Sequence, residues 1–92
     1  MDVLTPRDRL KEAPLRLIAA RIKRARKEAD LSHDRLGGQV GTSRQHLISL
    51  EKARHRPRLE MLTKIAEATG REIDWFLDPE VDPSPFPDAQ AA

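Results

Sequence analysis

The middle of the chain holds two short apolar patterns separated by a glycine, and this arrangement leaves few ways to fold. Leu36 and Val40 are four residues apart, as on one face of a helix, and Leu47 and Leu50 follow at a helical spacing of three. Gly41, between the two pairs, can adopt the left-handed conformation that ends a helix. Two short helices joined by so tight a turn must cross steeply and nearly touch.

Two predicted N-cap residues and a glycine support this interpretation. Ser32 is a good N-cap for the first of the two helices, and Ser43 is a good N-cap for the second, which we expect at about residues 43–52. Gly37 provides the small side chain that a close crossing needs. The pattern predicts a helix-turn-helix; the alternative is an ordinary αα-hairpin with no role in DNA binding.

The rest of the chain predicts further helices and no strand. Apolar residues recur at helical spacing over residues 15–29, 59–70 and 73–77, and a Thr-Pro pair opens a short extra helix that ends near residue 12. From Asp78 onward the chain is acidic and has four prolines. We therefore expect an all-α fold: a compact five-helix domain at residues 15–78, an N-terminal extension with a short helix at residues 1–14, and a disordered tail at residues 79–92.

Charge is segregated along the chain. Residues 15–58 carry twelve Lys/Arg against four Asp/Glu, a net charge of +8, whereas residues 59–92 have a net charge of −6. A basic block of this kind is typical of nucleic-acid-binding proteins, although basic solvated faces also occur in proteins that bind none. The lack of cysteine, of a signal-peptide pattern and of a long apolar stretch leads us to expect a cytoplasmic protein without a membrane partner.

Patterns typical of enzymes are missing from the sequence. We find no glycine-rich phosphate loop, no nucleophile paired with a base and no convincing pair of carboxylates. The three histidines are scattered and have no cysteine partners. We therefore expect no enzymatic activity, no metal and no cofactor.

Several short motifs of residues 15–77 together form a family pattern. They are Arg26, Leu31-Ser32, Gly41-Thr42-Ser43-Arg44-Gln45, Leu50-Glu51, Arg56-Pro57 and Ile73-Asp74-Trp75-Phe76-Leu77. With these motifs, residues 15–77 resemble the lambdoid-phage repressor and xenobiotic-response-element (XRE) family of regulators. This resemblance implies a five-helix, lambda-repressor-like domain that binds operator DNA as a dimer, and hence a transcriptional regulator, a repressor of the phage or prophage type.

Two positions depart from the family pattern. Gly37 stands where alanine is usual, and we expect it to loosen its helix by about 0.5–1 kcal/mol. Ala53 stands where the family usually has glycine, just after the second short helix, which is the recognition helix of the family. The sequence therefore does not determine the geometry of the following loop.

The outer face of the second short helix carries the candidate base-reading residues. N-terminal residues of a recognition helix contact base edges, where arginine suits guanine and glutamine suits adenine. We therefore predict that Arg44 and Gln45 are the main base-reading residues. Ser49 could form one hydrogen bond and Ile48 could touch a thymine methyl group, the alternative being that both are ordinary surface positions.

Phosphate contacts are expected at helix N-termini and in the basic loop, because backbone amides and basic side chains both favour anions. His33 matches a family position that meets the DNA backbone, although a lone histidine is often only a solvated polar residue. The predicted phosphate-contacting residues are Ser32, His33, Ser43, Lys52, Arg54 and Arg56.

Two charged residues interrupt inward-facing apolar rows. Arg26 continues the row of Ile18 and Ile22, and Glu51 continues the row of Leu47. We predict that Arg26 and Glu51 form a largely buried structural ion pair, the alternative being that both reach water at the rim.

Assembly and partners follow from the resemblance and from residues off the apolar rows. We expect double-stranded DNA as the partner and a homodimer that is weak in solution and forms on DNA. Trp75 is either a lid on the core or a dimer anchor, and an N-terminal helix with Leu4 and Leu10 is a rival interface. Two alternatives stay open: a DNA-binding antitoxin that grips a toxin through the tail or the extra helix, and a protein-interaction adaptor.

Overall fold

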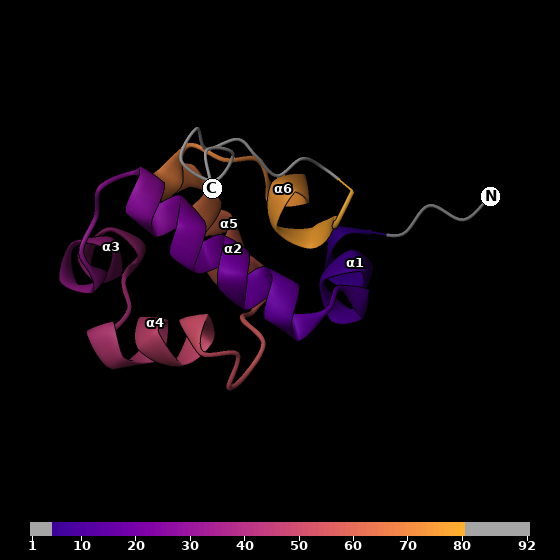
Figure 1. The fold of residues 1–92 in the computed structure, drawn as a ribbon, viewed down its shortest axis with the longest axis horizontal. Helices are drawn as coiled ribbons and strands as arrows, with labels where there is room; N and C mark the ends of the chain where they lie inside the picture. Colours follow the sequence, from indigo (N-terminus) through magenta and orange to yellow (C-terminus); the bar gives the residue numbers. More distant parts are fainter. Residues whose placement is uncertain (1–4, 81–92) are drawn as a thin grey trace, which may run out of the picture.

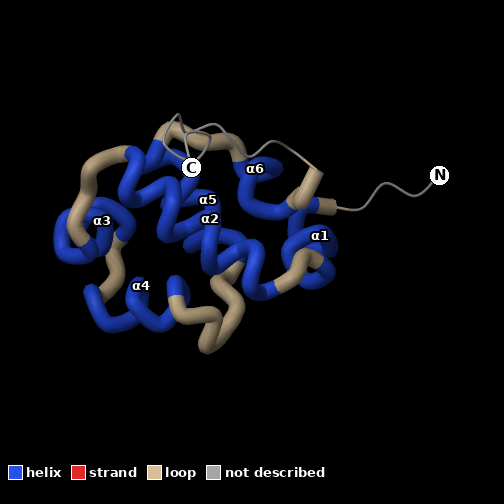
Figure 2. Tube along the Cα trace, viewed as in Figure 1, coloured by secondary structure: helices blue, strands red, loops and turns tan. Residues whose placement is uncertain are grey.

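A computed structural model describes residues 5–80, which form six helices and no strand (Figures 1 and 2). The predicted all-α fold, including the short extra N-terminal helix, is confirmed. Leu4 and the part of the predicted tail from residue 81 on lie outside the described residues. The helices are α1 (Pro6–Glu12), α2 (Leu15–Glu28), α3 (His33–Val40), α4 (Arg44–Glu51), α5 (Leu59–Thr69) and α6 (Ile73–Leu77).

Helix α2 crosses the middle of the molecule and organises the others around it. In Figure 1, α3 and α4 lie together at one end, α1 and α6 lie at the other end, and α5 passes behind α2. Helix α2 contacts α4, α5 and α6, while α3 contacts α4 and α5. The side chains that are almost fully buried between the helices are Ile18, Ile22, Leu36, Val40, Leu47, Leu50, Leu62, Ile65 and Phe76. Among residues 5–80, no helix has the length and apolar character to cross a membrane.

The helix-turn-helix formed by α3 and α4 has the caps that the sequence predicts. The hydroxyl oxygen of Ser32 accepts a hydrogen bond from the amide of Arg35, and that of Ser43 accepts one from the amide of His46, each 3.0 Å long. Each bond satisfies an amide that the first helical turn leaves without a partner. Gly41 ends α3 with a φ of 77°, a conformation that glycine adopts without strain.

Gly37 allows α3 to approach the turn backbone closely. A Cβ atom at this position would lie only 2.7 Å from the carbonyl oxygen of Thr42. The two residues are also joined by a hydrogen bond of 2.9 Å from the Thr42 amide to the Gly37 carbonyl. This close approach therefore requires a residue without a side chain, although glycine also weakens the helix.

Alanine substitutions at the two adjacent glycines of α3 should have opposite effects. We expect Gly37→Ala to lower the free energy of unfolding by about 1–3 kcal/mol, because the methyl group must displace backbone. Gly38→Ala should raise it by about 0.5–1 kcal/mol, because a Cβ there meets nothing within 4 Å and alanine is the better helix former. Urea denaturation measures both changes, and stabilisation by Gly37→Ala would show that the turn is less tightly packed than described.

Trp75 acts as a lid on the core. Trp75 is 5% exposed, and the guanidinium groups of Arg21 and Arg71 lie over its ring at 5.1 and 4.2 Å from the centroid. The Trp75 and Phe76 rings pack nearly perpendicular to each other, with a centroid distance of 5.1 Å. Leu10 of α1 is likewise buried in the same core. Trp75 and Leu10, two of the candidate dimer anchors, are thus packed inside the monomer.

Candidate DNA interface

The first turn of α4 presents two exposed polar side chains. Arg44 and Gln45 are both exposed, whereas Leu47 and Leu50 on the opposite face are 0% and 1% exposed. Ile48 and Ser49 are half-buried on the flank of the helix. A fixed apolar underside with polar residues at the free N-terminal turn is the arrangement that places side chains against base edges in a groove.

The expected phosphate-contacting residues fall into two groups at the ends of α3 and α4. Ser32 and Ser43 are the N-caps, and although each hydroxyl oxygen accepts a hydrogen bond, its own O–H can still donate. Lys52 and Arg54 are exposed at the C-terminal end of α4. Amide groups and hydroxyls at one end and cations at the other are both suited to contact the DNA backbone.

A network of three charged or polar side chains joins α2, α3 and α4. Arg26 donates two hydrogen bonds to Glu51, 2.7 Å from Nε to Oε2 and 3.1 Å from Nη2 to Oε1. The side chains are only 9% and 6% exposed. His33 Nε2 lies 3.1 Å from the same Oε1, and Arg26 Nη1 also donates to the carbonyl of Leu31. The structure thus directs the His33 ring to Glu51 and fixes the end of α4 to the other two helices.

Glu51 is held in its charged form by this network. Burial alone raises the pKa of Glu51, but hydrogen bonds from Arg26 and His33, together with their charges, more than offset this effect. The pKa of the carboxyl group is therefore below its ordinary value. A carboxylate ionised under physiological conditions is what the buried Arg26 guanidinium requires.

The loop after α4 begins with a strained residue. Ala53 has a φ of 57°, in the left-handed region that disfavours a side chain. Hydrogen bonds run from the Ala53 amide to the Leu50 carbonyl and from the Arg54 amide to the Ser49 carbonyl, 3.2 and 3.1 Å long. This pair of bonds is a Schellman motif, the helix ending in which glycine is preferred at the left-handed position. The loop therefore keeps the geometry of the motif although alanine occupies that position.

Ala53→Gly should stabilise the protein by about 1 kcal/mol, because glycine relieves the strain at a positive φ. The control is Ala29→Gly at the end of α2, where φ is −83°. That change should cost about 0.5–1 kcal/mol, because glycine gains only freedom in the unfolded chain. Thermal unfolding shows whether each variant is more or less stable than wild type, and a loss of stability in Ala53→Gly would contradict the assigned strain.

Arg56 makes a contact that the sequence did not predict. The side chain, one of the predicted phosphate-contacting residues, is exposed, and its guanidinium donates to the carbonyl groups of Leu10 and Ala13 at the end of α1. A neighbouring contact was not predicted either: His55 of the loop stacks on His46 of α4 with ring centroids 5.1 Å apart. In neither contact does the sequence identify the partner, because the two residues belong to different elements.

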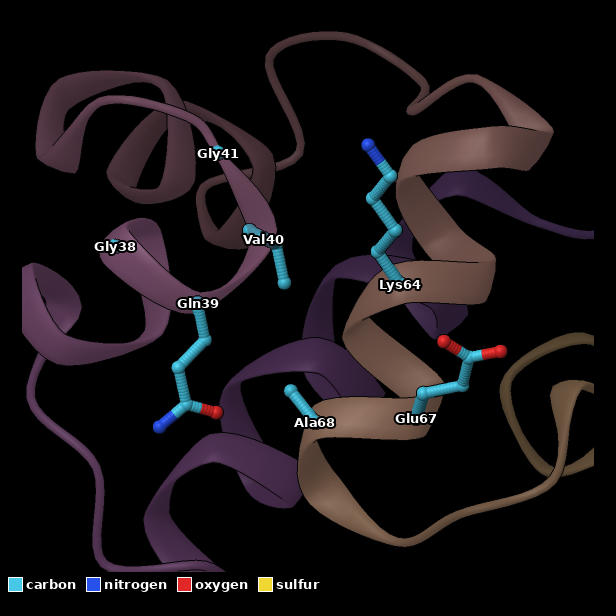
Figure 3. A pocket seen from close by; sticks show the side chains of 7 residues that line it. All are labelled: Gly38, Gln39, Val40, Gly41, Lys64, Glu67 and Ala68. Carbon is cyan, nitrogen blue, oxygen red and sulfur yellow. The ribbon is translucent and has the colours of Figure 1, made fainter.

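A groove of about 670 Å³ lies between α3 and α5 (Figure 3). Gln39 enters it from α3, and Lys64 and Glu67 line it from α5. Within the described part of the chain, no three His, Cys, Asp or Glu side chains come together as a metal site. The exposed first turn of α4 remains the candidate functional surface.

Comparison with known proteins identifies the fold and its family. A family model described as helix-turn-helix matches residues 22–76. An uncharacterised helix-turn-helix transcriptional regulator of Methanothermobacter thermautotrophicus is 45% identical over 51 residues, which are 55% of this chain and 74% of that protein.

Two solved structures are similar over most of their length. The P22 c2 repressor in complex with a synthetic operator has a TM-score of 0.64 and 25% identity, covering 68% of this chain and 96% of the repressor chain. The N-terminal DNA-binding domain of SinR from Bacillus subtilis has a TM-score of 0.66 and 26% identity, covering 73% and 99%. The chain therefore belongs to the XRE-type helix-turn-helix family of DNA-binding transcriptional regulators.

Proposed function

We propose that the protein is a sequence-specific regulator of the repressor type, which binds a palindromic operator in double-stranded DNA as a dimer. The observation that carries the proposal is the exposed first turn of α4, with Arg44 and Gln45 above an underside fixed by buried leucines. In the major groove, Arg44 would donate two hydrogen bonds to a guanine and Gln45 would pair with an adenine. The similar P22 c2 repressor, which was solved with an operator, supports this role.

The DNA backbone is contacted by the ends of α3 and α4. The amide groups and hydroxyls at Ser32 and Ser43, together with Lys52 and Arg54, hold α4 in register along the groove. His33, next to the first cap, contributes from the ring edge that does not face Glu51. Ser49 and Ile48 border the bases from the flank of α4.

The dimer is weak in solution and becomes stable on DNA. Trp75 and Leu10, the large apolar residues that could have anchored a strong interface, are 5% and 4% exposed in the monomer. Two half-sites on one DNA duplex bring the subunits together, with recognition helices about 34–36 Å apart. The operator must then have approximate dyad symmetry.

Selection from random duplexes with the full chain, followed by sequencing, tests the proposal. We expect one enriched site with two inverted half-sites whose centres are about one helical turn apart. An enriched site without dyad symmetry would exclude the symmetric dimer. The doubly substituted Arg44→Ala, Gln45→Ala protein is the control, and the same enriched site from this variant would show that α4 does not determine the sequence.

A further inference from the structure

The end of α1 lacks an intrahelical hydrogen-bond donor. Four residues after Leu10 the chain has Pro14, which carries no amide hydrogen and so cannot donate to the Leu10 carbonyl. The Arg9 carbonyl, one residue earlier, does receive such a bond, from the Ala13 amide at 2.9 Å. Leu10 and Ala13 are 4% and 6% exposed, so carbonyl groups at this end need another partner.

Arg56, in the loop between α4 and α5, supplies the missing donor. Its Nη1 atom donates to the Leu10 carbonyl at 2.8 Å and to the Ala13 carbonyl at 2.5 Å. A cation is also favoured there by the negative end of the helix dipole. The loop between α4 and α5 is therefore bonded directly to the N-terminal helix.

The same loop is held at its other points by the body of the domain. Ala53 closes the end of α4, His55 stacks on His46 of that helix, and Pro57 is buried. Arg54 lies exposed within this fixed segment, next to the histidine. A contact that fixes the position of Arg56 thus also restricts the position of Arg54, two residues earlier in the same loop.

We propose that Arg56 is a positioning residue, through which α1 holds the loop after the recognition helix in its DNA-binding conformation. Helix α1 lies outside residues 22–76, the segment matched by the family model. This inference rests on the proposed function. It makes the N-terminal helix part of the DNA-binding apparatus without contact to DNA.

The salt dependence of DNA binding separates a positioning residue from a phosphate-binding one. With the full chain and the selected duplex, Arg56→Ala should weaken binding about tenfold, because the loop is deprived of two charge-assisted hydrogen bonds, while the slope of log affinity against log salt stays at the wild-type value. The control Arg54→Ala should lower the magnitude of that slope by about one for each phosphate that the variant no longer neutralises.

A second variant loosens α1 at its other end. Thr5 caps the helix by accepting from the Asp8 amide at 3.1 Å, and it is exposed. Thr5→Ala should weaken DNA binding a few-fold in the wild-type background, since removal of the cap frays the helix, and should add nothing in the Arg56→Ala background. Circular dichroism at the assay temperature establishes that each variant is folded.

The outcomes distinguish this inference from the proposed function. A lowered salt slope for Arg56→Ala would mean that the residue binds phosphate, and unchanged affinity would leave its bonds to α1 without a role; either result overturns the inference alone. If wild type shows no salt-dependent binding to the selected duplex, the proposed function itself fails. Should Arg56→Ala not fold, Thr5→Ala decides: weaker binding with an unchanged slope supports the positioning role, and unchanged affinity overturns it.

Discussion

Replacing Glu51 by alanine is expected to lower the free energy of unfolding by about 3–5 kcal/mol, the largest effect on stability that we predict. The substitution leaves the Arg26 guanidinium buried, with a side chain 9% exposed, and without its carboxylate partner. It also removes the contact of His33 across to α4. Urea denaturation followed by the fluorescence of Trp75, the only tryptophan of the chain, measures the loss.

Two other substitutions show whether burial and charge cause the loss of stability. Glu67 is exposed on α5, and Glu67→Ala should change the free energy of unfolding by no more than about 0.5 kcal/mol. Glu51→Gln keeps an oxygen that accepts from Arg26, so its cost should be smaller than that of alanine. If Glu51→Ala melts within about 2 °C of wild type, the ion pair contributes far less than its geometry indicates.

The same carboxylate should make stability depend on acidic pH. Because the pKa of Glu51 is lower in the folded than in the unfolded chain, its contribution is complete above the unfolded pKa of about 4.3. The contribution is lost as the pH falls through the lower folded pKa. Wild type should therefore lose stability relative to Glu51→Gln as the pH falls below about 4.3. Parallel curves for the two proteins in this range would contradict the lowered pKa.

Helix positions could be predicted because their signals are local. Ser32 and Ser43 start helices, Gly41 ends one, and the apolar spacing between them leaves one buried face. The same local logic placed Arg26 and Glu51 on inward rows, where a buried charge needs a partner. Such signals act within a few residues and do not depend on the rest of the fold.

Contacts between distant elements could not be predicted in this way. Arg56 is 46 residues from Leu10, and in the sequence it is one more arginine in a basic loop. The signal that could have identified the site is Pro14, which removes the donor for the Leu10 carbonyl, but it does not name the replacement. At Gly37 the sequence predicts a close crossing, but it does not show that a Cβ would meet the Thr42 carbonyl oxygen at 2.7 Å.

The assignment of base-reading residues can be tested because base-reading and phosphate-binding side chains affect different quantities. Arg44→Ala and Gln45→Ala should each remove about 1–3 kcal/mol of discrimination between the preferred base and its competitors. The effect should appear at one or two operator positions and symmetrically in both half-sites. Affinity for unrelated duplexes should fall much less, because base contacts carry sequence information while phosphate contacts carry the non-specific part of the affinity.

A matched glutamine and a matched arginine serve as controls in the same chain. Gln39 is exposed on α3 beside the groove of Figure 3, so Gln39→Ala should leave the preferred sequence unchanged. Arg54→Ala should weaken binding to all sequences alike, because a residue beyond the C-terminal end of α4 meets backbone only. Selection experiments on each variant give the preferred sequence directly. Because Leu47 and Leu50 fix the buried side of α4, the first turn of this helix is the part that is free to enter the major groove of the DNA. A changed preference in Arg54→Ala or Gln39→Ala, with none in Gln45→Ala, would mean that a different element contacts the bases.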